Sequence, residues 1–335
     1  MGILLREEVL QPALVDVLLE KLAEFAAILD AQMMDKNVPK LILRELRWLD
    51  HVVDSKQLVE KLIAALPAFP PSLQQEIIYI LPELASDEDA VIVVNALLEL
   101  IRNEAGMVVC CIEALGNFNV LNDQTTSILQ CVLERLDSSP LVDLPVIVKY
   151  LIQEAPAVDV EKMVHQIREK LSSMLAFKPS KSPSANNSVN GSGVEEEALI
   201  LGSIVQGMYF RDDLMKAFVA QIQSAAQLLL LDLWILVGVH SIPQHQLKLE
   251  KLLVKKAKSS ILTPGALAVG ISGHGNALKP YFSSLMGIAG ILVDQAGSSE
   301  CRELGSFLYQ ILFDEFAGLS TSTGSSAQSA FYQGE

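Results

Sequence analysis

Residues 12–30 read PALVDVLLEKLAEFAAILD, and this stretch indicates the fold class. Its apolar residues recur at intervals of three and four, which places them on one face of a helix. They are Leu14, Val17, Leu18, Leu22, Phe25, Ala26 and Leu29. Pro12 suits the first turn of a helix, where a missing amide hydrogen costs no hydrogen bond. We therefore predict an amphipathic helix over this stretch.

The same pattern returns along the first half of the chain, separated by turns that carry proline. Pro39 opens PKLILRELRWLDHVV, Ser55 precedes KQLVEKLIAAL, and Pro70 with Pro71 leads into SLQQEIIYILPEL. No segment of this half places a convincing hairpin dipeptide between alternating strands. The short helices share no strict sequence period, as is typical of HEAT-like helical pairs. We expect an all-α fold, an α-solenoid of HEAT-like helical pairs.

Charged and capping residues indicate where several of these helices begin. The acids Asp87, Glu88 and Asp89 are expected in the first turn of a helix that ends near Arg102, matching both ends of the helix dipole. Capping residues begin the three helices that follow, and these are Asn122 or Asp123, Asp143 and Asp159. Because the dipole accounts for the acidic runs, they give little support for paired catalytic carboxylates.

The composition changes after Phe177, where KPSKSPSANNSVNGSG offers almost nothing to bury. The expected division is a helical solenoid over 1–175, a flexible linker or loop over 176–193, a second helical region over 194–316 and a disordered tail over 317–335. Helices of the second region are predicted at Val194–Phe210, Asp212–Val239 as two helices, Gln244–Leu262, Asn276–Val293 and Ser298–Phe316. The glycines of GALAVGISGHG, near position 270, indicate a flexible loop.

Hydrophobicity and charge exclude several classes of protein. Half of the 335 residues are hydrophobic and the net charge is −15, so any contact with DNA has to be local, because an acidic surface repels phosphates. The most apolar stretch, Leu228–Val239, contains Asp232 and is too short to span a membrane, so it is predicted as a buried core helix. The first residues, MGILLREEVL, lack the pattern of a secretory signal.

Motifs for catalysis or for binding metals and cofactors are not found in the sequence. The five histidines have no metal-ligand spacing, and they are His51, His165, His240, His245 and His274. The four cysteines likewise suggest neither zinc nor disulfides, and they are Cys110, Cys111, Cys131 and Cys301. Neither a phosphate-binding glycine loop nor a nucleophile elbow is present. We therefore expect no enzyme, no cofactor and a reducing compartment.

A basic stripe is predicted on the helix that contains residues 246–258. Lys248, Lys251, Lys255 and Lys258 fall within about 80° of arc at 100° per residue, beside an arc of leucines. Such a stripe is a candidate contact for phosphates or for an acidic partner. The alternative is an ordinary solvated helix face. No aromatic residue alternates with the lysines, so stacking of single-stranded nucleic acid is not supported.

Lys279 stands out for its position near a predicted helix start. Asn276 is expected to cap a helix that begins ALKPYFSSLMGIAGILV, which places Lys279 and Pro280 in its first turn. The positive end of the dipole there mildly favours the nucleophilic amine over the ammonium. On this argument alone, an ordinary exposed lysine is the better interpretation.

Three groups of segments resemble the Fanconi anaemia group D2 protein family, in order and in approximate spacing, over Arg44–Phe316. The first is RELRWLDHVVDSKQLVEKL followed by SLQQEIIYILPEL, the second is LVDLPVIVKYLIQEAPAVDVEKMVHQIREKL, and the third is ALKPYFSSLMGIA with GSFLYQILFDEF after it. Members of this family are several times longer. The resemblance therefore implies a truncated N-terminal portion, whose tail after Phe316 departs from the family.

The resemblance implies a nuclear α-solenoid that pairs with the Fanconi anaemia group I paralogue and acts as a clamp on double-stranded DNA in interstrand crosslink repair. It also implies monoubiquitination, by a conjugating enzyme and a ligase, on the lysine of LKPYFSS, which is Lys279 here. Pro280 stands where an acidic residue is expected. The main alternative is a generic HEAT-type interaction adaptor without a repair role, and the third is an enzyme whose site the sequence does not reveal.

Overall fold

The computed structural model describes residues 4–27, 38–49, 51–118, 122–156, 159–173, 192–259, 261–271, 275–295 and 297–316. Within these ranges every regular element is a helix, which confirms the all-α prediction. The chain forms two compact units, Met1–Ser139 and Pro140–Glu335. Residues 176–191 of the predicted linker and the predicted tail 317–335 lie outside the described residues. The four-part division of the chain remains a prediction.

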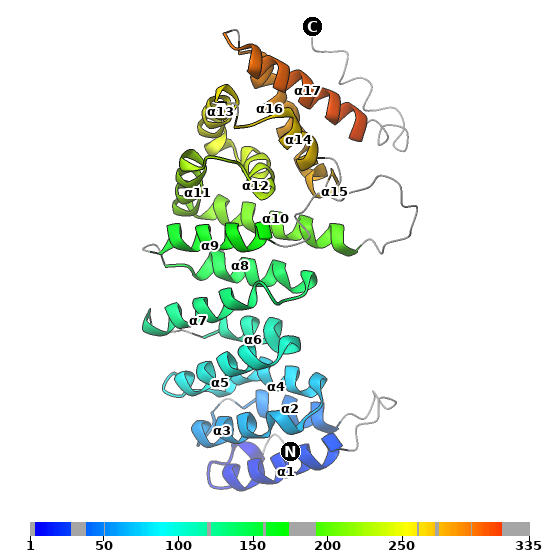
Figure 1. Cartoon of the computed structure of the whole chain (residues 1–335). Helices are drawn as coiled ribbons and strands as arrows, with labels where there is room; N and C mark the ends of the chain where they lie inside the picture. Colours follow the sequence, from blue (N-terminus) through cyan, green and yellow to red (C-terminus); the bar gives the residue numbers. More distant parts are fainter. Residues whose placement is uncertain are drawn as a thin grey trace. The chain divides into compact units, whose positions relative to one another are not determined.

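Two layers of helices build the first unit. Its helices are α1 (Gln11–Ala27), α2 (Val38–Arg47), α3 (Ser55–Ala65), α4 (Pro71–Leu84), α5 (Ala90–Asn103), α6 (Val108–Leu115) and α7 (Asn122–Arg135), with short 3-10 turns η1 (Leu4–Arg6), η3 (Leu66–Ala68) and η4 (Ala105–Met107). Helix α4 packs between α2 and α6, while α5 packs between α3 and α7 (Figure 1). Helices two apart in sequence are thus neighbours in one layer, as in a solenoid of helical pairs.

Polar contacts repeat at nearly constant sequence separation, although the sequence itself has no strict period. Lys40 pairs with Glu76 and Arg47 with Glu83, both at a separation of 36 residues. The Tyr79 hydroxyl donates to Glu113 across 34 residues, from α4 to α6. These separations equal the length of one helical pair, so they identify the structural repeat.

The acidic run before α5 lies outside the helix, so its predicted place in the first turn is wrong. Helix α5 begins at Ala90, and Asp89 is its N-cap residue. The Asp89 carboxylate instead accepts hydrogen bonds from the hydroxyls of Ser55 and Ser86, at 2.5 and 2.7 Å. These bonds lower the pKa of Asp89 and tie the turn to the start of α3. Arg102 lies in the last turn of α5, as predicted.

The second unit surrounds a central apolar helix. Its elements are η5 (Leu141–Asp143), α8 (Leu144–Glu154), α9 (Val160–Ser173), α10 (Ser192–Phe210), α11 (Asp212–Ser224), α12 (Leu230–His240), α13 (Pro243–Lys258), α14 (Pro264–Ile271), α15 (Gly275–Leu278), η7 (Lys279–Tyr281), α16 (Phe282–Val293) and α17 (Ser299–Phe316). Helix α12 packs against α9, α10, α13, α14 and α16. Residues 231–240 of α12 are all buried, which confirms the predicted core helix.

Residues 264–271, predicted as a flexible loop, form helix α14 instead. The helix forms despite its glycines because its apolar side chains are buried in the core of the second unit. Leu267 and Ile271 are 7% and 3% exposed, and α14 packs against α12 and α17. Tertiary burial therefore outweighs the low helix propensity of glycine at this site. The following residues, 272–274, lie outside the described part of the chain.

Candidate functional site

Lys279 lies in a tight turn between two helices, so the prediction of one continuous helix from Asn276 is wrong. Helix α15 ends at Leu278, and the 3-10 turn η7 spans Lys279–Tyr281 before α16 begins at Phe282. Pro280 explains the break, because proline disfavours helical geometry in the residue before it. Lys279 thus precedes α16 instead of occupying its first turn. The argument from the dipole of a long helix does not apply to it.

Buried neighbours hold the Lys279 turn in place while the lysine itself is exposed. Ala277 and Leu278, directly before it, are 0% and 1% exposed. Tyr281, two residues after it, is half-buried, and burial raises the pKa of its hydroxyl. Among the described residues, no carboxylate forms an ion pair with Lys279. The turn therefore presents an exposed lysine side chain on a firmly anchored backbone.

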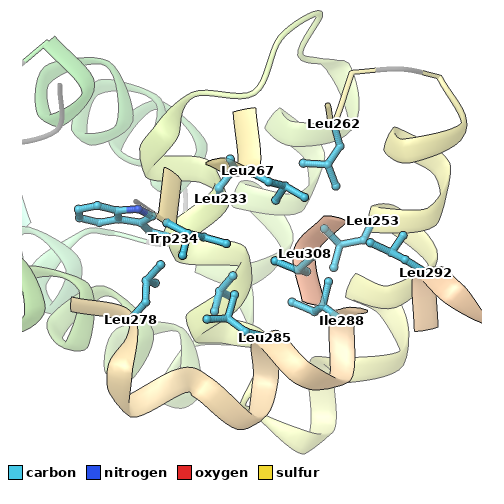
Figure 2. Close-up of a pocket in the computed structure, with 12 residues that line it drawn as sticks. Leu233, Trp234, Leu253, Leu262, Leu267, Leu278, Leu285, Ile288, Leu292 and Leu308 are labelled. Carbon is cyan, nitrogen blue, oxygen red and sulfur yellow. The ribbon is translucent and has the colours of Figure 1, made fainter. Parts of the chain in front are cut away.

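The anchor of this turn is an apolar cluster at the centre of the second unit. Leu278 faces a cavity of about 20 Å³ together with Trp234 and Leu285 (Figure 2). The remaining lining residues are Leu233, Val237, Leu253, Leu262, Leu267, Ile271, Ile288, Leu292 and Leu308. A cavity of this size holds at most about one water, so the cluster is a packed core and not a ligand site.

The predicted basic stripe is present on α13. Lys248, Lys251, Lys255 and Lys258 are all exposed. Lys256, in contrast, points inward and donates to the carbonyl oxygens of Gln223 and Ala225 at 3.2 and 2.8 Å; burial lowers its pKa. The stripe is thus a distinct surface and does not include every lysine of the helix.

Three of the four stripe lysines line an open groove of about 440 Å³ between α13 and the end of α16. The lining residues are Glu250, Lys251, Val254, Lys255, Lys258, Ile291 and Gln295. Ile291 lies nine residues into α16, about 14 Å along the helix axis from its start. The structure therefore does not bring the basic groove and Lys279 together into one site.

His240 is a buried titratable group beside the groove. Its side chain is 3% exposed, and Nε2 lies 3.5 Å from Oε1 of Glu250 without forming a hydrogen bond. A Cβ atom added at Gly287 would lie 3.2 Å from the ring, so His240 also contacts α16. Burial lowers the pKa of His240, and the charge of Glu250 only partly opposes this effect.

We expect acidification to destabilise the second unit through His240. The folded pKa lies below the ordinary value of 6.5, so the unfolded chain binds the proton more readily, and the free energy of unfolding falls as the pH drops below about 6.5. Urea unfolding measured from pH 7.5 to 5 checks this prediction. His240→Leu should reduce the dependence of the free energy of unfolding on pH. The control is His165→Leu, which removes a histidine whose side chain is 53% exposed. If His240→Leu left the pH dependence of the free energy of unfolding unchanged, His240 would not be the source of the acid sensitivity.

Two partly buried arginine contacts were not predictable from the sequence because their partners are distant along the chain. Arg168 of α9 forms a bidentate ion pair with Asp232 of α12, with nitrogen–oxygen distances of 2.6 and 2.8 Å. Arg211, between α10 and α11, donates to the carbonyl oxygens of Ile152 and Ala155, both at 2.8 Å. The presence of Asp232 within the apolar stretch Leu228–Val239 was the one signal of a buried ion-pair partner. Nothing in the sequence identified Arg168.

Within the described residues, no group of three or more histidine, cysteine, aspartate or glutamate side chains is placed to hold a metal ion. The four cysteines are buried and unpaired. In the same part of the chain, no helix is both long and apolar enough to cross a membrane.

The fold defines the chain as an all-α helical repeat protein, and comparison with known proteins identifies its family. The family model described as "Fanconi anaemia protein FancD2 nuclease" matches residues 1–322. The chain therefore belongs to the FancD2 family.

The relatives of the chain are much longer. The Fanconi anemia group D2 protein of Gallus gallus is 26% identical over 330 residues, which cover 94% of this chain and 23% of the relative. The homologue of Mus musculus is 26% identical over 331 residues, with the same shares of coverage. The homologue of Rattus norvegicus is 26% identical over 304 residues, 86% of this chain and 21% of the relative. The chain thus spans less than a quarter of the length of these relatives.

Proposed function

We propose that the chain is a non-enzymatic scaffold of DNA interstrand crosslink repair, monoubiquitinated on Lys279 and acting in the nucleus with the group I paralogue as a clamp on double-stranded DNA. Membership of the FancD2 family supports the repair role. The observation that carries the acceptor assignment is the exposed amine of Lys279 on a turn anchored by the buried Leu278. No membrane and no cofactor take part in this function.

The geometry around Lys279 suits an acceptor of ubiquitin. The amine of Lys279 attacks the thioester that links ubiquitin to the conjugating enzyme, an isopeptide bond forms, and the thiol of that enzyme leaves. Because the conjugating enzyme and the ligase supply the activated carbonyl, the acceptor needs mainly access and a defined position. The attached ubiquitin then adds a second contact to the paralogue, and tethering slows dissociation by raising the effective concentration.

The basic stripe on α13 is proposed as a second contact, for phosphates or for an acidic partner. Lys248, Lys251, Lys255 and Lys258 are exposed on one face of the helix. Because the net charge of the chain is −15, a favourable contact with an anion requires such a local cluster. Double-stranded DNA is expected to bind only within the complete complex.

Lys279→Arg should abolish monoubiquitination by the cognate conjugating enzyme and ligase in vitro. Arginine keeps the positive charge but is not a nucleophile at neutral pH, so only acceptor function is removed. The reaction is followed as the appearance of a single shifted band. Lys162→Arg, on the exposed face of α9, is the matched control and should react like the unaltered chain. Unchanged single-site modification of Lys279→Arg would refute the acceptor assignment.

Two alternatives are separated by direct assays. The description of the family model includes the word nuclease, so an end-labelled duplex incubated with the chain and Mg²⁺ or Mn²⁺ tests that activity. A scaffold leaves the DNA intact.

A generic helical adaptor would not form nuclear foci after crosslinking damage, nor co-purify with the group I paralogue in the presence of crosslinked DNA. Foci and co-purification are the results expected for the repair scaffold.

A further inference from the structure

The groove between α13 and α16 combines lysines with an apolar line. On α13, Leu247, Lys251, Val254 and Lys258 follow one another at spacings of four, three and four, which places them within about 60° of arc. Leu247 is 72% exposed, and Val254 is half-buried in the groove wall. Apolar and basic side chains therefore alternate along one row of about 17 Å.

The opposite wall extends the apolar line. Ile291 of α16 is half-buried and lines the groove together with Val254. The volume of the groove, about 440 Å³, suits several side chains of a docked segment and is too open to enclose a small molecule. A partner that fits this surface needs apolar side chains as well as charge.

The charges of the groove lysines are not neutralised within the described chain. Neither Lys251, Lys255 nor Lys258 forms an ion pair there, whereas Lys216 on α11 pairs with Asp212 at 2.7 Å. Glu250, the one carboxylate in the groove lining, lies against His240. Three unpaired cations in a chain of net charge −15 form a local site of opposite sign for an acidic partner.

We propose that this groove binds an acidic amphipathic helix of a partner protein, with carboxylates opposite the lysines and aliphatic side chains against Leu247, Val254 and Ile291. The inference rests on the proposed function of the stripe as an anion contact and names the class of partner. A nucleic-acid backbone would use the lysines but would bury nothing against the apolar line. Recognition of a helix in a groove uses both features.

A designed peptide tests the proposal on the whole chain. The probe is a fluorescent helical peptide in which leucine and glutamate alternate at spacings of four and three. Its controls are a scrambled peptide of the same composition and a short DNA duplex. In anisotropy titrations, the patterned peptide should bind at least about tenfold more tightly than the scrambled peptide, because only the former aligns its leucines and carboxylates with the groove.

Substitutions on the two sides of the groove separate charge from apolar contact. Lys251→Glu with Lys258→Glu should weaken binding of the peptide about tenfold or more, since two attractions become repulsions. Val254→Ser should weaken it without changing its dependence on salt. Lys162→Glu, on the exposed face of α9, is the matched control and should bind like the unaltered chain.

The proposal is overturned if the patterned peptide fails to bind, if the scrambled peptide binds equally well, or if the groove substitutions have no effect. Duplex binding that depends on the groove lysines, without binding of the peptide, would assign the surface to nucleic acid instead. The ubiquitination assay depends on Lys279, and the peptide assay depends on the groove residues. Failure of the peptide experiment can therefore be distinguished from failure of the acceptor assignment.

Discussion

Asp232→Ala should lower the free energy of unfolding by about 3–5 kcal/mol, because it leaves the charge of Arg168 buried without a partner. The Asp232 side chain is fully buried and the Arg168 side chain is 12% exposed. The carboxylate also accepts a hydrogen bond from the backbone amide of Leu229, the N-cap residue of α12, at 2.8 Å. The substitution therefore removes this capping hydrogen bond as well. Urea denaturation gives the change, and hydrogen exchange of the α12 amides shows where it acts.

Two control variants separate the buried charge from ion pairing in general. Arg47 and Glu83 form an equally short bidentate pair, but at the surface, so Arg47→Ala should have a much smaller effect. Replacing Arg168 and Asp232 together by leucine should recover part of the loss, since no unpaired charge remains. If Asp232→Ala were no more destabilising than Arg47→Ala, the ion pair would not support the core.

Gly305→Ala should destabilise the second unit by about 1–3 kcal/mol through overpacking between α16 and α17. A Cβ atom at Gly305 would lie 2.8 Å from the carbonyl oxygen of Ala289 and 2.8 Å from the amide nitrogen of Val293. Both contacts are to backbone, so α16 has to shift as a whole. Because α16 follows directly on the Lys279 turn, hydrogen exchange of η7 and α16 should increase.

Gly202 of α10 is the matched control for Gly305, because a Cβ atom there meets nothing within 4 Å. Gly202→Ala should stabilise the chain by about 0.5–1 kcal/mol, since alanine loses less backbone entropy in a helix. Thermal unfolding of both variants provides the comparison. A stabilising Gly305→Ala would show that α16 and α17 do not pack as closely as the structure indicates.

Much of the fold follows from local sequence, because apolar spacing reports which face of a helix is buried. Leu228–Val239 was predictable as a core helix from its composition, and α12 covers most of it. The basic stripe of α13 was equally predictable, since helical periodicity alone places Lys248 and Lys255 on one face.

Other features depend on tertiary contacts or on competition between local signals. Around Lys279, the capping residue Asn276 favoured one helix, but Pro280 tightened the backbone into a 3-10 turn. Residues 264–271 became helical because Leu267 and Ile271 reach the core. The partner of Asp232 lies 64 residues away, a separation that no periodicity reports.

The groove was invisible to sequence analysis for the same reason. Its lysines were found on one helix, but Ile291 and Gln295 belong to the end of α16 and the residues that follow. The lysine spacing of residues 246–258 therefore indicates a basic stripe but not the apolar wall beside it. That wall is what favours an acidic amphipathic helix over a chain of phosphates.

The most direct test of the acceptor assignment is to map ubiquitin on the unaltered chain. After reaction with the cognate conjugating enzyme and ligase in the presence of the group I paralogue, tryptic peptides are analysed by tandem mass spectrometry for the glycine–glycine remnant on lysine. A single remnant on Lys279 is the predicted result. A remnant confined to other lysines, with Lys279 unmodified, would contradict the proposed function.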